Sequence, residues 1–187
     1  MTTMTNLNLE AIIHRILKDV QVELVDEFDK NFQRQGFFAE AWARRKSPVG
    51  RGPLLISTGQ LRRSIQGRVE GDALTFVSTL PYASIHNEGG EIKVTRRMKK
   101  FFWHKYYECV KGWGRKKNGD KSNDKKTRRL TTEAEFWKAM ALMKAGKSIR
   151  IPRRKFLGTS PEVEKIVRET IEDCLNEYFD NIEITKQ

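Results

Sequence analysis

Apolar residues near the N-terminus recur at spacings of three and four, which is typical of one side of a helix. The series consists of Leu9, Ile12, Ile13, Ile16, Leu17, Val20, Leu24 and Phe28. Asn8 can cap the start of this helix, because its side chain can accept a hydrogen bond from a free backbone N–H. We expect Gly36 to end it. The pattern therefore predicts a long amphipathic helix over residues 8–33.

A second helical series lies near the C-terminus. It follows Ser160-Pro161-Glu162, which combines a capping side chain, a proline suited to the first helical position and an acid near the positive helix end. Its apolar side consists of Val163, Ile166, Val167, Thr170, Ile171, Cys174, Leu175, Tyr178 and Phe179. The preceding residues 148–160 predict a strand and a turn.

Between these two helices the pattern changes first to a loop and then to a short helix. Residues 37–53 contain several Gly, Pro and Ser residues, which favour turns over regular structure. Thr58 can then cap a short helix that holds Leu61 and Ile65 on its apolar side.

Alternation with a period of two follows and predicts strands. Residues 65–69 and 74–78 each alternate apolar or small positions with polar ones, and Gly71-Asp72 between them favours a hairpin turn. The next residues predict a further extended or short helical element. A Gly-Gly turn then leads into a strand at Ile92–Val94.

Charge is distributed unevenly along the 187 residues, whose net charge is +12. Residues 93–155 hold 22 Lys and Arg against 5 Asp and Glu, a net charge of +17. The rest of the chain holds 14 basic and 19 acidic residues, a net charge of −5. A basic excess of this kind indicates an acidic or polyanionic partner for the 93–155 segment.

Two helices are predicted inside this basic segment. Residues 98–113 are rich in aromatic side chains, and residues 131–146 predict a second helix that Thr132 can cap. The apolar stripe of the second helix consists of Phe136, Trp137, Met140 and Met143. Residues 114–129 are polar and predict a mobile tip between the helices. Its cations, which are candidate contacts for a protein partner or DNA, are Arg115, Lys116, Lys117, Lys121, Lys125, Lys126, Arg128 and Arg129.

These elements together predict an α+β fold. Long N-terminal and C-terminal helices would pack on a small, mainly antiparallel sheet, and a basic helical arm would be inserted at about residues 95–150. The length fits a single domain over residues 1–187 that contains this insertion.

Few residues suggest a disulfide, a metal site, a cofactor site or a catalytic site. Cys109 and Cys174 are distant in sequence and lie in helical patterns, so a disulfide framework is not expected. Three scattered His residues give no metal-ligand spacing, and no nucleotide fingerprint or credible carboxylate pair is present, so we expect no metal, cofactor or enzyme activity. Glu10 interrupts the first fifteen residues, so we expect no signal peptide, and no apolar stretch is long enough to span a membrane.

Two features nevertheless invite a functional interpretation. His86 has Ser and Thr residues nearby in sequence, but nucleophilic catalysis also needs an orienting acid and an oxyanion site. Glu88 is the only local acid, and a structural histidine is the favoured interpretation. Gly89-Gly90 could form an anion-binding nest, although a turn with positive φ explains the pair more simply.

The segment "NFQRQGFFAEAWARR" ends the N-terminal helix, and three short motifs follow it in order along the chain. "TGQLRRS" carries Thr58, Gly59, Leu61 and Ser64, "YASIHNEGG" carries Tyr82, Ala83, His86, Gly89 and Gly90, and "RKFLG" carries Arg154, Phe156, Leu157 and Gly158. With the helices at both ends, this order resembles the phage virion morphogenesis family, which includes the Mu-type G protein and the P2-type tail completion S protein. Lys155 stands where the family often has Pro, and the basic insertion is longer than compact members need.

The resemblance implies a structural protein that acts in tail completion or head–tail joining. It also implies a homo-oligomeric ring, for which a hexamer is one candidate. Expected partners are further copies of the chain and phage tail-tube, neck or head-connector proteins, with non-specific DNA contact as a further option and no membrane. The expected location is the virion tail or neck, and the bacterial host cytoplasm during assembly. The alternative function is nucleic-acid binding through residues 93–155.

Overall fold

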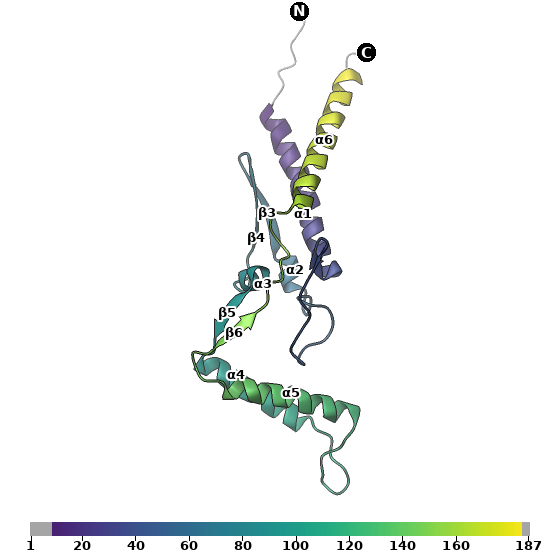
Figure 1. The fold of residues 1–187 in the computed structure, drawn as a ribbon. Coiled ribbons are helices and arrows are strands. Elements are labelled where there is room, and N and C mark those ends of the chain that lie inside the picture. The colour runs from purple at the N-terminus through teal and green to yellow at the C-terminus, as the bar shows by residue number, and fades with distance from the viewer. Residues whose placement is uncertain (1–8, 185–187) are drawn as a thin grey trace, which may run out of the picture. The chain divides into compact units, whose positions relative to one another are not determined.

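The computed structural model describes residues 9–184, which form six helices and six strands. In chain order these are α1 (Leu9–Arg34), β1 (Gly36–Phe37), β2 (Glu40–Ala41), α2 (Gln60–Arg63), β3 (Ile65–Glu70), β4 (Ala73–Ser78), α3 (Ala83–Glu88), β5 (Gly90–Lys93), α4 (Arg96–Lys111), α5 (Lys125–Leu142), β6 (Ser148–Ile151) and α6 (Pro161–Ile184). Figure 1 shows their course. None of the helices within these residues is long and apolar enough to cross a membrane.

The α+β fold predicted from the sequence is confirmed, but the strands are arranged differently. They form three separate antiparallel ladders of two strands each, β1–β2, β3–β4 and β5–β6, rather than one sheet. The β3–β4 hairpin turns at Gly71-Asp72 as predicted, with Gly71 at a φ of 64°. Such a two-residue turn suits the twist of paired strands.

The chain divides into two compact units. The first combines the chain up to Trp42 with Pro53–Asn87 and the residues from Arg154 onward. The second combines Ala43–Gly52 with Glu88–Arg153 and so contains the residues expected to form the inserted arm. A single domain over the whole chain stays a prediction.

The core of the first unit is built on one side of α1. Val20, Leu24 and Phe28 are buried, as the periodic pattern predicted, and Phe32 continues the same spacing and is buried as well. Leu9 and Ile13 of the predicted series are exposed. The other members of this core are Phe37, Trp42, Leu61, Ile65, Ala83, Phe156 and Val163. Within this unit α1 contacts both α6 and the β3–β4 hairpin (Figure 1), so α1 links the second long helix to the hairpin.

The end of α1 differs in detail from the prediction. The helix ends at Arg34, and the residue in the left-handed region is Gln35, with a φ of 58°, rather than Gly36. Gly36 opens β1, where a Cβ would lie only 2.6 Å from the Glu40 carbonyl oxygen. Close strand pairing therefore explains this glycine. The predicted cap Asn8 lies outside the described residues.

In the second unit α4 and α5 pack against each other. The ring of Phe102 in α4 stacks on Trp137 in α5, with centroids 5.8 Å apart. The buried side chains of α5 are Thr127, Ala134 and Ala141. The predicted stripe of Phe136, Trp137, Met140 and Met143 is therefore only partly correct, since these four are half-buried and small residues form the packed centre.

The start of α5 was predicted wrongly. The helix begins at Lys125, because the Asp124 side chain caps it by accepting the Thr127 N–H at 2.9 Å. Thr132 lies two turns inside the helix, where its hydroxyl donates to the Arg128 carbonyl at 3.3 Å. Residues 125–129 are therefore helical, and only 112–124 connect the two helices.

Candidate functional site

The "RKFLG" segment of the first unit is held by polar side chains that come from distant parts of the chain. The Asn87 side chain at the end of α3 accepts the N–H groups of Phe156 at 2.9 Å and Leu157 at 3.0 Å. It also donates to the Leu157 carbonyl at 3.0 Å. One amide thereby satisfies three backbone groups of a segment without regular structure, which fixes the path of the chain.

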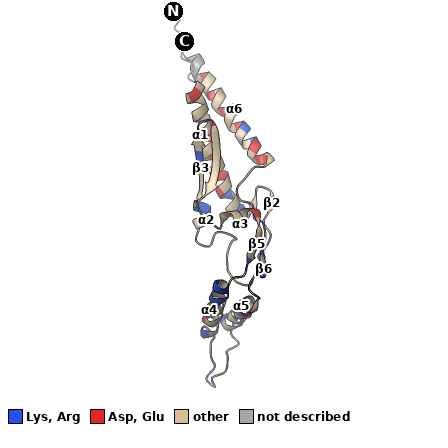
Figure 2. Cartoon of the chain, turned by 90° about the vertical axis from the view of Figure 1, so that its left-hand side faces the viewer, with Lys and Arg blue, Asp and Glu red and all other residues tan. Residues whose placement is uncertain are grey.

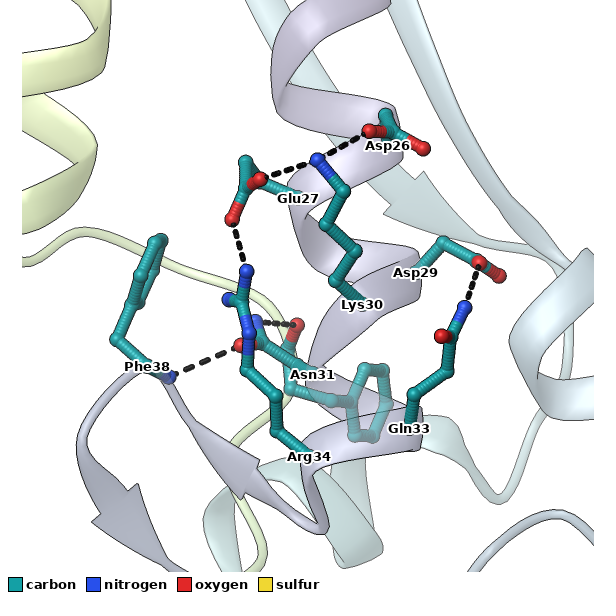
Figure 3. A network of polar contacts seen from close by, with 9 residues as sticks. Asp26, Glu27, Asp29, Lys30, Asn31, Gln33, Arg34 and Phe38 are labelled. Atoms are coloured by element: carbon teal, nitrogen blue, oxygen red, sulfur yellow. Dashed lines mark hydrogen bonds and ion pairs between the residues drawn. The ribbon is translucent and has the colours of Figure 1, made fainter.

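The opposite side of the same segment contacts α1 and the β1–β2 region. The indole N–H of Trp42 donates to the Lys155 carbonyl at 2.6 Å. Asn31, which is fully buried, accepts the Phe38 N–H at 2.9 Å and donates to the Phe156 carbonyl at 3.4 Å (Figure 3). The Phe156 ring packs on Phe32 with centroids 5.2 Å apart. This family-motif phenylalanine is therefore a core anchor.

Charged side chains surround the last turns of α1 (Figure 3). Lys30 pairs with Asp26 and Glu27, each at 2.6 Å, and Arg34 pairs with Glu27 at 2.8 Å. The hydrogen bonds that the Lys30 ammonium donates, first to Asp26 and then to Glu27, raise the pKa of Lys30. Burial alone would raise the pKa of Glu27, but the hydrogen bonds from Lys30 and Arg34 lower it. These charges neutralise one another at the end of the helix.

The "TGQLRRS" motif forms the short helix α2 and the turn before it. Gly59 is the N-cap residue, with a φ of 69° and no capping side chain, so the prediction that Thr58 caps this helix is wrong. Leu61 is buried, and the Ser64 hydroxyl donates to the Leu61 carbonyl at 2.7 Å. Ser64 also lies 2.6 Å from the Ser78 hydroxyl, which ties the start of β3 to the end of β4.

α2 is shorter than expected, and Ile65 belongs to β3 instead. Ile65 had been predicted for the end of this helix and also for the strand that follows, and the strand prediction is confirmed, with Ile65 buried.

The contacts of His86 join parts of the fold. Its backbone carbonyl accepts the Arg154 N–H at 2.8 Å, which joins the second motif to the third. Its ring lies at right angles to Tyr82, with centroids 6.1 Å apart, and Ala83 of the same helix is buried. Burial, and then the charge of Arg154, lower the pKa of His86. Its buried Nδ1 has no hydrogen-bond partner among the described residues, so the orienting contact that a catalytic histidine needs is not observed there.

The motif glycines allow backbone conformations with positive φ and, at Gly89, a close contact between backbone segments. Gly89 has a φ of 76°, and a Cβ there would lie 2.8 Å from the Arg153 nitrogen in the same unit. Gly90 has a φ of 147° and opens β5, where it pairs with Ile151. Gly158 has a φ of 138°. The ladder begins at Gly90 rather than at the predicted Ile92, so the pair ends α3 and starts a strand.

The eight cations of the predicted tip are all exposed, but they do not share one loop. Arg115, Lys116, Lys117 and Lys121 lie in the connection between the helices, whereas Lys125, Lys126, Arg128 and Arg129 lie on the first turns of α5. The connection has internal order, since the Lys116 N–H donates to the Asp120 carbonyl at 2.7 Å and the Lys121 ammonium lies 4.1 Å from the centre of the Trp113 ring. Arg129 pairs with Glu133 at 3.3 Å.

Comparison with known families explains why these motifs occur together. The profile of the phage virion morphogenesis family matches residues 7–176. The chain belongs to this family. Comparisons with curated proteins and with solved structures gave no significant match. Membership supports a structural or assembly role in a phage particle.

In this member of the phage virion morphogenesis family, the motif residues meet as parts of a scaffold. The second and third motifs are joined through His86, Arg154 and the "RKFLG" segment, whereas the first is attached through Leu61 and the Ser64–Ser78 contact. Within residues 9–184 no group of three His, Cys, Asp or Glu residues could hold a metal ion.

Three residues that complete this scaffold were missed from the sequence. Asn31 lies in a helix, Trp42 in a predicted loop and Asn87 within the second motif, and each contacts residues 155–157 from far away in the chain. The same signal was available for all three, because Asn31 and Trp42 lie in the family segment "NFQRQGFFAEAWARR" and Asn87 lies in "YASIHNEGG", yet none had a role assigned to it.

Proposed function

We propose that the protein is a structural subunit that completes the phage tail or joins head to tail, and that it acts as part of a homo-oligomeric ring. The observation that carries the proposal is the family match over residues 7–176. The proposed location is the tail or neck of the virion, reached after assembly in the bacterial host cytoplasm. The proposed partners are further copies of the chain and tail-tube, neck or head-connector proteins.

The contacts of the motif residues support a non-catalytic role. Phe156 and Leu61 fill the core, Gly59 and Gly89 allow positive φ, and Asn87 fixes the third motif. A scaffold of this kind presents a surface of fixed shape, which is what a subunit between two larger assemblies needs. We propose that the protein has no turnover of its own.

The test is genetic and structural. A stop codon early in the gene, in the phage or inducible prophage that encodes it, is expected to give particles whose heads and tails are unjoined or whose tails are unfinished. Supply of the wild-type chain in trans should restore joined particles in electron micrographs. Normal particles in the null mutant, or arrest before heads and tails form, would contradict the proposal.

A second candidate function is nucleic-acid binding by the arm. The observation that favours it is the exposure of all eight tip cations in a segment with a net charge of +17. Phosphate contacts would make the affinity for duplex DNA fall steeply with salt, with a slope in log–log form of about −0.9 for each phosphate neutralised. Fluorescence anisotropy with labelled DNA at several salt concentrations measures this slope, and a flat response would exclude the candidate.

A further inference from the structure

The first unit has an acidic groove between α1 and α6. Its volume is about 590 Å³, and its lining residues are Asp19, Glu23, Ile166, Glu169, Thr170, Asp173, Cys174 and Glu177. Arg15 offsets part of this charge, because it pairs with Glu177 and lies 3.9 Å from Asp19. Figure 2 shows acidic residues along α6. The lining of the groove therefore combines five carboxylates with an aliphatic side chain and a thiol.

The second unit has the opposite charge. It holds 24 Lys and Arg against 7 Asp and Glu, whereas the first unit holds 12 against 17. Figure 2 shows the basic residues on α4 and α5. The tip cations, Arg115, Lys116, Lys117, Lys121, Lys125, Lys126, Arg128 and Arg129, are exposed and are joined by the described ion pairs to one carboxylate only, that of Glu133.

These two surfaces are complementary and occur on the same chain. A contact between different surfaces of identical subunits is heterologous, and repetition of such a contact builds a ring when the rotation closes. We propose that the basic tip of one copy docks into the acidic groove of a second copy. This inference rests on the proposed function, because it names the two surfaces that meet between neighbouring subunits of the proposed ring.

The chemistry of the groove favours a Lys- or Arg-bearing segment over other occupants. Its five carboxylates repel the phosphates of DNA, so DNA is not an occupant of this groove. Long basic side chains can place their ammonium or guanidinium groups against the walls while their aliphatic stems cover Ile166 and Cys174. Opposite charges across the interface would set the register of docking and raise the rate of encounter.

Charge reversal on each side tests the contact. The groove variant is Glu169→Lys with Asp173→Lys, and the tip variant is Lys125→Glu with Lys126→Glu; all four positions are exposed. The matched controls are Glu164→Lys with Glu172→Lys, which lie on α6 outside the groove, and Lys138→Glu with Lys144→Glu, which lie in the arm away from the tip. Sedimentation equilibrium of the full chain measures self-association, and circular dichroism verifies the fold.

The groove variant and the tip variant should each weaken self-association by about tenfold or more, and the two controls should match the wild type. A chain carrying both sets of changes should recover association, because the charges are exchanged. Wild-type behaviour of either variant, loss of association in the tip variant alone, or a wild-type chain that stays monomeric would overturn the contact. The proposed assembly function is judged separately by the particles of the null mutant, so the two can fail independently.

If the tip serves DNA instead, the tip variant loses affinity for duplex DNA and keeps its self-association. That result would assign the arm to nucleic acid and would also overturn the contact with a second copy.

Discussion

Asn87 holds Leu157 by both of its backbone polar groups, since the side-chain oxygen accepts the Leu157 N–H and the side-chain nitrogen donates to the Leu157 carbonyl, each at 3.0 Å. The amide thus pairs with the backbone as a neighbouring strand would. It can do so only because an amide has both a donor and an acceptor.

Asn87→Asp should therefore lower the free energy of unfolding by about 1–3 kcal/mol, because the Leu157 carbonyl loses its donor and faces a carboxylate. Urea unfolding followed by tryptophan fluorescence measures the change. Asn176→Asp is the control, since Asn176 is exposed on α6 in the same unit, and it should stay within about 0.5 kcal/mol of the wild type. Equal effects of the two substitutions would show that the Asn87 contacts do not stabilise the fold.

Two glycines of the second unit allow the stability cost of a positive φ to be measured separately from the cost of a close contact at the Cβ position. Gly119 has a φ of 87° with open space around its Cβ position, so Gly119→Ala should cost only the strain of positive φ, about 1–2 kcal/mol. Gly89 has a similar φ of 76° and also lies against the Arg153 backbone, so Gly89→Ala should cost more. Thermal unfolding compares the two variants. If the Gly89 variant is as stable as the Gly119 variant, the close contact with the Arg153 backbone does not matter for stability.

The core residues of the motifs should differ in importance according to burial. Leu61→Ala should lower the free energy of unfolding by about 2–5 kcal/mol and Phe156→Ala by about 3–5 kcal/mol, because both side chains are buried. Leu157 is only half-buried, so Leu157→Ala should cost less than Leu61→Ala. Chemical denaturation ranks the three variants, and a larger effect at Leu157 would contradict this assignment.

The fold should lose stability when pH falls through the ordinary titration range of histidine. Burial and the neighbouring Arg154 charge lower the pKa of His86 in the folded protein, so the unfolded chain binds this proton more readily. Stability from His86 is therefore present above its unfolded pKa and is lost as pH falls below that value towards the folded pKa. Urea unfolding between pH 7.5 and pH 5.5 measures the slope, which should flatten in His86→Gln; an unchanged slope would exclude His86 as its source.

Thr127 should be more important to the arm than Thr132, which the sequence favoured as a cap. The buried Thr127 hydroxyl accepts the Gly114 N–H and donates to Asp124, each at 2.9 Å. Thr127→Val leaves the Gly114 N–H without its acceptor and should destabilise the helical pair by about 1–3 kcal/mol. Thr132→Val changes an exposed position and should stay within about 0.5 kcal/mol. Amide hydrogen exchange across α4 and α5 distinguishes the two results.

Sequence periodicity gave the elements that bury a continuous apolar side. α1 was predicted because Val20, Leu24 and Phe28 repeat at helical spacing, and the β3–β4 hairpin because alternation stops at a turn dipeptide. The start of α5 was missed because the basic residues before Leu130 have no apolar period and Asp124 and Thr132 are both suitable caps. Packing of Thr127 against the connection decides between them, and that contact is not visible in a linear pattern.

Strand partners and the polar scaffold also depend on distant residues. Alternation identifies a strand but not its neighbour, so one sheet was expected where three ladders occur. Leu61 was correctly expected on an apolar side, whereas the N-cap at Gly59 and the contacts of Asn87 were not foreseen. The local sequence does not determine which groups an Asn side chain will bind. Only the fold brings Asn87 to the "RKFLG" segment.

The β5–β6 ladder brings the two ends of the arm together, with Gly90 opposite Ile151 and Lys93 opposite Ser148. A segment whose entry and exit are neighbours can be lengthened, shortened or exchanged at little entropic cost, because closing the chain across paired strands needs only a short turn. Evolution could therefore alter the α4–α5 pair as a cassette while the residues that anchor "RKFLG" stay in place. The same property makes Lys93 and Ser148 natural junctions for grafting the arm of one family member onto another.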